Sequence, residues 1–143
     1  MTDNSELVKR ILVAVDGSEN SNKAVGMAAA IARDLHVELT VVHVMEMDEF
    51  PTLIAEAQDE SKEEMGEIIL ADAVKMARLS GVEPKLKLLR GHAAGQILRF
   101  AEEYSPQLIF LGSHGRSPER KLFMGGVSEA VSRKAKASVV IVR

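Results

Sequence analysis

The sequence contains no cysteine and no tryptophan, and only one tyrosine and four prolines occur among its 143 residues. The missing cysteine excludes disulfide bonds, thiol catalysis and cysteine-ligated zinc, and it fits a reducing compartment. Scarce aromatic rings leave few platforms on which nucleic-acid bases could stack. The formal net charge of −3 gives no electrostatic reason to expect nucleic acid as a partner.

Long apolar runs are also absent, since none approaches the roughly 20 residues that a membrane-spanning helix needs. The N-terminal stretch MTDNSELVKR lacks the apolar segment of a signal peptide. We therefore expect a cytoplasmic protein with no membrane and no nucleic-acid partner. Hydrophobic residues at 46% and charged residues at 27% are ordinary for a globular chain, and the length predicts a single domain over residues 1–143.

Short apolar runs alternate with amphipathic stretches along the whole chain. Apolar runs predict buried strands at residues 11–15, 39–45, 108–111 and 138–142, the second of them interrupted by Thr40 and His43. Alternation at residues 85–90 predicts a third strand with one face in water, at an edge of the sheet.

Helical spacing of apolar residues fills the gaps between these strands. It predicts helices at about 18–36, 56–80 and 125–136, and another marked by Ile97, Ala101 and Tyr104. In the long helix, Met65, Ile69, Ala73 and Met76 are expected on one face, and residues 47–55 before it are predicted to form a mobile loop. The order predicts an α/β fold, a single-domain doubly wound five-stranded parallel sheet with helices on both faces.

The last strand is apolar throughout, and as the final element we expect it at an edge of the sheet. An exposed apolar edge invites pairing with another chain. We expect a homodimer joined through Val139–Val142; the alternative is an edge covered by a flanking loop of the same chain.

Candidate binding residues follow the strands, where ligands of open parallel sheets bind. Asp16 comes directly after the first strand, and its carboxylate suits either sugar hydroxyls or the N-terminus of the next helix. Gly112 and Gly115 permit close backbone approach and positive φ, whereas Gly125 and Gly126 open a helix whose free N–H groups form an anion site. The four glycines suit a phosphate chain, with a plain turn and a helix cap as the alternative.

Motifs for other nucleotide folds and for catalysis are missing. The sequence has no GxxxxGK[ST] and no GxGxxG after the first strand. His114 is expected to be a packing or hydrogen-bonding loop residue, and His43 a core histidine with its hydrogen bonds satisfied. No histidine has a partner at metal-ligand spacing, so we predict no catalytic residue and no metal site made by the protein alone.

The stretch Gly112-Ser-His-Gly115, followed by nine residues and Gly125, resembles the ATP-binding signature of universal stress proteins, G-x-x-G, nine residues, G-[S/T]. The segments ILVAVDGSENS, VVHV, RGHAAGQIL and ASVVIV extend the resemblance over essentially the whole chain. The resemblance implies strand order 3-2-1-4-5, a Rossmann-like fold of the adenine nucleotide alpha hydrolase type, and a role in stress response. It also implies a cytoplasmic homodimer through the last strand.

The resemblance further implies where an adenine nucleotide (ATP, ADP or AMP) would bind. Adenine would lie near Ala14 and Val44, Asp16 and Gly112 would hold the ribose, and Leu111 would pack beside the nucleoside. The residues expected around the phosphates are Gly115, Gly125, Gly126, Val127 and Ser128. Val15 and Arg116 complete the predicted site, Arg116 as a phosphate contact or a solvated loop charge, and Mg²⁺ would bind only through the phosphates.

One position departs from the signature, because Gly126 stands where the family has Ser or Thr. The lost hydroxyl predicts weaker hold on the terminal phosphate, so AMP and ADP should compete well with ATP; Ser128 is a candidate to replace it. The leading interpretation is a nucleotide-binding regulatory dimer with an unknown protein partner. The alternatives are an interaction module of the same family that binds no nucleotide, which Gly126 favours, and a slow ATPase.

Overall fold

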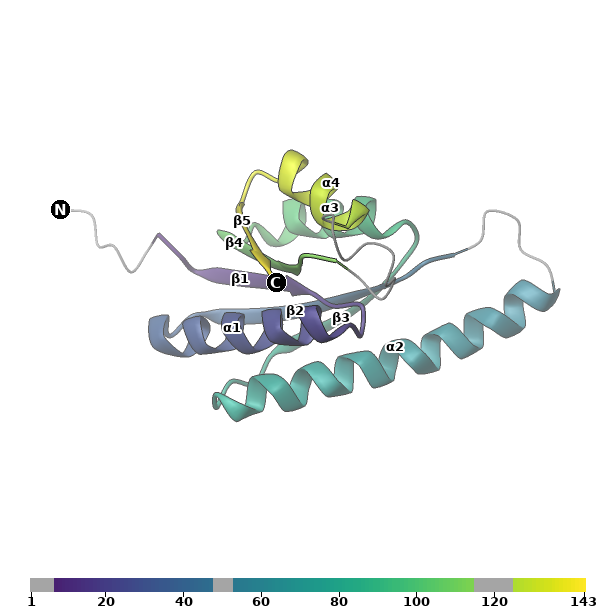
Figure 1. Cartoon of the computed structure of the whole chain (residues 1–143), viewed down its shortest axis with the longest axis horizontal. Helices are drawn as coiled ribbons and strands as arrows, with labels where there is room; N and C mark the ends of the chain where they lie inside the picture. The colour runs from purple at the N-terminus through teal and green to yellow at the C-terminus, as the bar shows by residue number, and fades with distance from the viewer. Residues whose placement is uncertain (1–6, 48–52, 115–124) are drawn as a thin grey trace.

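A computed structural model describes residues 7–47, 53–114 and 125–143, and the side chains of residues 53–59 lie outside that description. Within it, five parallel strands alternate with four helices (Figure 1). The elements are β1 (Arg10–Ala14), α1 (Glu19–Leu35), β2 (Glu38–Met45), α2 (Leu53–Leu79), β3 (Lys85–Arg90), α3 (Ala93–Tyr104), β4 (Leu108–Gly112), α4 (Gly126–Lys134) and β5 (Ser138–Val142).

The strands lie in the order β3-β2-β1-β4-β5, which confirms the predicted sheet and its strand order. The central strand β1 pairs with β2 on one side and β4 on the other, so that Val13 lies opposite both Val41 and Phe110. The chain first winds outward through β2 and β3 and then returns to build β4 and β5. The direction of winding therefore reverses between β1 and β4, where their carboxyl ends diverge.

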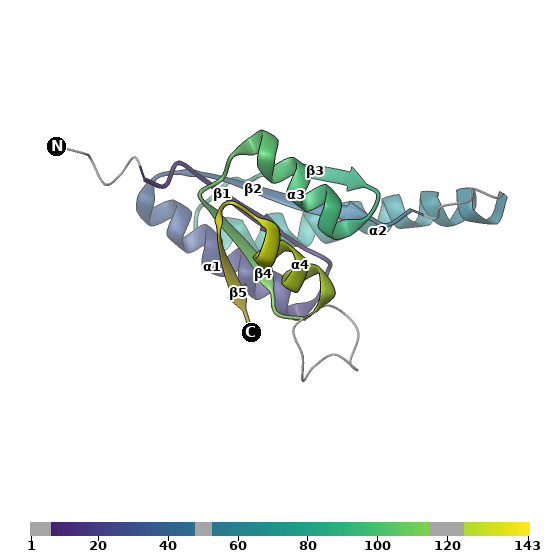
Figure 2. The same cartoon turned by 90° about the horizontal axis from the view of Figure 1, so that it is seen from above.

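Two helices cover each face of the sheet (Figure 2). Alternate residues of β1 point to opposite faces: Ile11 and Val13 pack under α1 and α2, whereas Leu12 and Ala14 pack under α3 and α4. The strands β1, β2 and β4 are mostly apolar on both faces because helices cover both faces.

The long helix α2 crosses the sheet diagonally and extends past the carboxyl ends of the strands (Figure 1). Its buried residues include Gly66, Ile69 and Ala73, but Met65 is 43% exposed. The prediction that Met65 shares the buried face of Ile69 and Ala73 was therefore wrong. Gly66 takes that place, and a Cβ there would lie 2.9 Å from Leu88 Cδ1 and 3.1 Å from His43 Cδ2, so α2 packs closely against the sheet at this position.

Two predicted boundaries also differ from the structure. The last helix ends at Lys134 instead of Lys136, because Ala135 is already extended with ψ 142° and starts the turn into β5. The long helix begins at Leu53, so residues 53–55 of the expected loop are helical. Residues 48–52 of that loop lie outside the described part of the chain.

The two edge strands differ in chemistry. At one edge, β3 carries Lys85, Lys87 and Arg90, all exposed. At the other edge, β5 reads Ser-Val-Val-Ile-Val and has no charge. Over the parts of the chain that the structure covers, no helix has the length and apolar character to cross a membrane.

Candidate functional site

A cavity of about 360 Å³ opens at the carboxyl ends of β1, β2 and β4, where the winding reverses. Its walls come from these strand ends, from the turn after β1, and from the first turns of α3 and α4. The lining residues are Ala14, Val15, Asp16, Ser18, Ser21, His43, Val44, Ala93, Ile97, Leu111, Gly112, His114, Gly125, Gly126, Val127 and Ser128.

Every predicted binding residue that the structure describes lies in this lining. The predicted residues Gly115 and Arg116 lie outside the described part of the chain. The structure thus brings together residues that are separated by more than a hundred positions in the sequence, from Ala14 to Ser128.

The inner part of the cavity is apolar. Ala14, Val44 and Leu111 come from three adjacent strands, and their side chains are at most 9% exposed. Ile97, on α3, belongs to the same buried cluster and closes this part from above the sheet. Small and branched apolar walls of this kind suit a flat ring system better than a charged group.

A polar turn follows β1 at one side of the cavity. Ser18 is the N-cap of α1, because its Oγ accepts the N–H of Ser21 at 3.1 Å. Asp16 is not the cap; its Oδ1 accepts the N–H of Ser18 at 2.9 Å, and Gly17 between them has a φ of 83°. Among the described residues none donates to the second carboxylate oxygen of Asp16, so that oxygen can accept from a ligand.

Gly112 also packs closely against a neighbouring helix. Its φ is not positive, so the positive φ that glycine permits is not used at this position. A Cβ at this position would lie 3.0 Å from Ser21 N and 3.1 Å from the carbonyl carbon of Asn20. Gly112 therefore lets the first turn of α1 pack against the end of β4, which brings the two sides of the cavity together.

The N-terminus of α4 forms the other polar wall. Gly125 is its N-cap and has no side chain that could cap the helix. The N–H of Gly125 donates to Ser113 O, just after β4, at 2.7 Å. The first backbone bond of the helix runs from Glu129 N to Gly125 O, so the N–H groups of residues 126–128 have no partner within the helix. Such a group of N–H donors, aligned with the helix dipole, favours an anion.

The hydroxyl of Ser128 is already bonded within the protein. Ser128 is 6% exposed, and its Oγ donates to the carbonyl oxygen of Gly112 at 2.5 Å. The expectation that Ser128 replaces the hydroxyl missing at Gly126 is therefore wrong. The described end of α4 offers main-chain N–H groups and no free side-chain donor.

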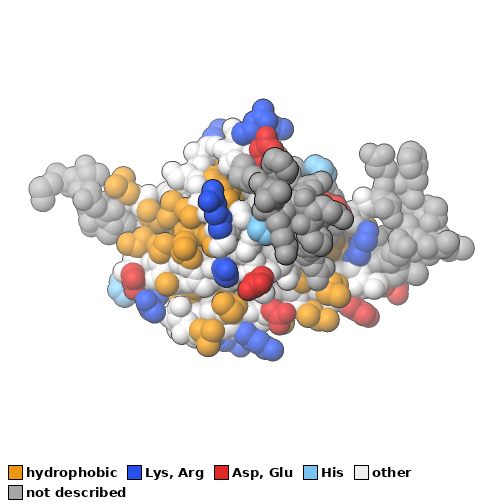
Figure 3. Space-filling view, viewed as in Figure 1, with side chains coloured by type: hydrophobic (Ala, Val, Ile, Leu, Met, Phe, Trp, Pro, Cys, Tyr) orange, Lys and Arg blue, Asp and Glu red, His pale blue; other side chains and the backbone are white. Residues whose placement is uncertain are grey.

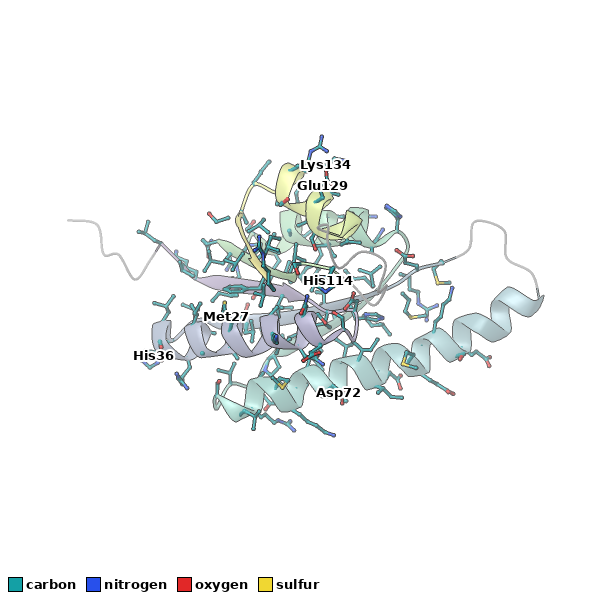
Figure 4. All side chains as sticks on the ribbon, viewed as in Figure 1. Met27, His36, Asp72, His114, Glu129 and Lys134 are labelled. Atoms are coloured by element: carbon teal, nitrogen blue, oxygen red, sulfur yellow. The ribbon has the colours of Figure 1, made fainter. Side chains whose placement is uncertain are left out.

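His114 lies between the end of β4 and the beginning of α1 (Figure 4). Its Nδ1 is 3.0 Å from Ser113 Oγ, and Asn20 Nδ2 lies 3.1 Å from both Ser113 Oγ and His114 Nδ1. This agrees with a hydrogen-bonded loop residue. In the described part of the chain no carboxylate bonds to the ring, so no catalytic triad forms there.

Sequence reasoning did not include Ser18, Ser21, Ala93 and Ile97 in the site. Ala93 and Ile97 carry a usable signal, since they are four residues apart at the start of a helix that follows a sheet strand. His43 is partly buried, and its Nδ1 is 2.8 Å from Val15 O, so its hydrogen bond is satisfied as predicted. In the described ranges, no three His, Asp or Glu side chains gather into a metal site.

These features define a doubly wound α/β protein with a ligand cavity at its strand-order reversal. The chain belongs to the universal stress protein family, whose model matches residues 8–143. The universal stress protein YxiE of Bacillus subtilis is 33% identical over 149 residues, covering 96% of this chain and 100% of YxiE.

Solved structures show the same fold. A universal stress protein from Archaeoglobus fulgidus superposes with a TM-score of 0.77 at 26% identity, over 94% of this chain and 93% of that protein. A universal stress protein in complex with cAMP superposes with a TM-score of 0.76 at 23% identity, over 96% and 98% of the two chains. At that identity the second likeness shows the fold alone.

Proposed function

We propose that this protein binds an adenine nucleotide in the cavity at the β1–β4 reversal. One observation carries the proposal: a single cavity joins apolar walls to a carboxylate on one side and an uncapped helix N-terminus on the other. The three parts match the three parts of a nucleotide. The base would lie among Ala14, Val44 and Leu111, the ribose beside Asp16, and the phosphate at the N-terminus of α4.

The cavity's size supports a small ligand. Its 360 Å³ falls at the low end of the range for small-molecule sites. A structural neighbour whose ligand is cAMP shows that this fold accommodates an adenine nucleotide in at least one protein. The proposal for this chain rests on its own cavity and not on that neighbour.

The composition of the α4 N-terminus supports a preference among the nucleotides. Gly126 has no hydroxyl, and the Ser128 hydroxyl is already bonded to Gly112. We infer that AMP and ADP compete well with ATP, because the described site supplies no side-chain donor for a terminal phosphate. Mg²⁺ would enter only with the phosphates.

We also propose a homodimer through β5, with the residues Val139–Val142 pairing across the interface. Val139, Val140 and Ile141 are only partly buried in the single chain. Apolar side chains gather over β5, the start of β1 and the adjoining side of α1 (Figure 3). There Met27 is 47% exposed, and Val140 and Ile31 are partly buried.

In this proposal the cytoplasmic dimer reports nucleotide occupancy to a protein partner. Among the described lining residues, we assign the Asp16 carboxylate to the ribose, and the rings of His43 and His114 are hydrogen-bonded within the protein, so a binding and signalling role accounts for the site better than hydrolysis. The interaction module without nucleotide remains the competing function, and the experiment below separates the two.

Isothermal titration of the purified protein with AMP tests the proposal directly. The test variant, Ala93→Phe, fills part of the cavity with an aromatic ring. The control, Ala71→Phe, places the same ring at an exposed position of α2. We expect the wild type and Ala71→Phe to bind and Ala93→Phe to lose at least tenfold in affinity. No binding by the wild type at millimolar AMP would contradict the proposal and favour the interaction module.

A further inference from the structure

His43, on β2, hydrogen-bonds to the main chain of Val15, one residue beyond the last paired residue of β1. Val15 follows β1, and its N–H still donates to Val42 O at 2.8 Å. Its carbonyl oxygen lies 2.8 Å from Nδ1 of His43. A carbonyl oxygen only accepts, so the hydrogen of this bond belongs to Nδ1, and neutral His43 has its proton on Nδ1.

The ring of His43 is held from behind by α2. A Cβ at Gly66 would lie 3.1 Å from His43 Cδ2, so the helix backbone passes directly against the imidazole. His43 is therefore fixed between α2 and the last peptide of β1, while its other side contributes to the cavity wall.

The bonded carbonyl belongs to the peptide that precedes Asp16. A peptide unit is planar, so fixing the carbonyl oxygen of Val15 also fixes the N–H of Asp16 and the direction in which its chain leaves the strand. On the other side of that peptide, Asp16 N donates to Ser21 Oγ at 3.3 Å, a long bond. The shorter bond to His43 is the stronger constraint on the turn.

We propose that His43 is a positioning residue for the candidate site: through the carbonyl of Val15 it sets the orientation of the Asp16 carboxylate toward the cavity. This inference rests on the proposed nucleotide site. In this proposal His43 acts through Val15 and does not itself contact the ligand's phosphate or ribose.

A matched pair of substitutions isolates the hydrogen bond. Asparagine and leucine have the same branching at Cγ, but only His43→Asn keeps a nitrogen donor near the position of Nδ1. We expect His43→Leu to weaken AMP binding about tenfold, the scale of one lost hydrogen bond, and His43→Asn to stay within about threefold of the wild type. His36→Asn, at the exposed C-cap of α1, serves as the control and should leave AMP affinity unchanged.

Two measurements by NMR test the inference without any nucleotide. The ring nitrogen shifts of His43 in the wild type should show the proton on Nδ1, and amide exchange at Asp16 and Ser18 should accelerate in His43→Leu but not in His43→Asn. A proton on Nε2, or equal exchange and equal AMP affinity in the Leu and Asn variants, would overturn the positioning role. A wild type that binds no AMP but shows the expected shifts and exchange would instead overturn the proposed function.

Discussion

The hydroxyl of Ser128 donates to the main-chain carbonyl oxygen of Gly112 across 2.5 Å, which joins the first turn of α4 to the last residue of β4. Gly112 in turn lies against the first turn of α1, where a Cβ would come within 3.0 Å of Ser21 N. One strand end thus holds two helix N-termini at fixed positions around the cavity. The arrangement gives the Ser128 hydroxyl a structural role, while the main-chain N–H of Ser128 stays at the cavity.

Ser128→Ala should lower the free energy of unfolding by about 1–3 kcal/mol, because the Gly112 carbonyl loses its buried donor. Urea denaturation followed by circular dichroism measures this. Ser132→Ala is the matched control, since the Ser132 hydroxyl bonds Glu129 O on an exposed turn of the same helix and its loss should cost less than about 0.5 kcal/mol. Equal stability of Ser128→Ala and Ser132→Ala would show that the bond from Ser128 to Gly112 does not stabilise the fold.

Gly126→Ser should raise the affinity for ATP relative to AMP by about tenfold, because it adds a hydroxyl donor beside a bound phosphate. Gly126 is exposed at the first position of α4, and thermal unfolding checks that the variant folds. Titration calorimetry with ATP and AMP gives the ratio. Gly95→Ser, on an exposed turn of α3 where a Cβ would make only an ordinary contact with His92 Cδ2 at 4.0 Å, should leave the ratio unchanged. A wild type that binds ATP far more tightly than AMP would make the inference from Gly126 wrong.

Glu38 makes stability depend on pH. Its carboxylate pairs with Lys85 and accepts the hydroxyl of Tyr104 at 2.7 Å, and these contacts hold the pKa of Glu38 below its ordinary value of 4.5. A lowered folded-state pKa means that the contribution is complete above about pH 4.5 and is lost as pH falls through the lower folded-state pKa.

The lowered pKa of Glu38 is tested by measuring stability at two pH values. The stability advantage of the wild type over Glu38→Gln should be present at about pH 6 and should shrink by about pH 3, in urea titrations at each pH. Glu67→Gln, on the exposed face of α2, is the control and should show no comparable change. An advantage that persists undiminished at the lower pH would contradict the role of the Glu38 pairing.

Val140→Lys should convert a dimer to a monomer, because it places a charge on the apolar edge proposed to pair. Sedimentation velocity measures the mass, and thermal unfolding checks that the variant still folds. Leu86→Lys makes the same change on β3, where Leu86 is 42% exposed, and should leave the dimer intact. A monomeric wild type at about 100 µM, a concentration far above the dissociation constant of a stable dimer, would rule out the β5 interface.

The sequence was sufficient for the sheet because β1, β2 and β4 are buried on both faces and appear as largely apolar runs, whereas the exposed strand β3 appears as an alternating pattern. The runs at residues 11–15 and 108–111 lie within a residue of β1 and β4. It failed where a contact between distant elements decides the outcome. Met65 has the same spacing as the buried residues of α2, and only the close approach of Gly66 to Leu88 shows that the helix is rotated away from it.

The same limit applies to the site. The residue types that line the cavity could be listed from the strand ends, but the partner of each polar group could not. Ser128 looked like a phosphate donor until its hydroxyl was found on Gly112, and Gly112 looked like a flexible turn until it was found against α1. The hydrogen-bond partner of a side chain is a property of the assembled structure, because both residues must be placed before it exists.

The unequal edges of the sheet set how far self-association could proceed. If β5 pairs with β5 of a second copy about a two-fold axis, both uncharged edges are used up. What remains at either end of the combined ten-strand sheet is β3 with Lys85 and Lys87, whose like charges repel further strands. Strand addition would then stop at two chains, so the apolar edge would produce a closed dimer and not a fibre.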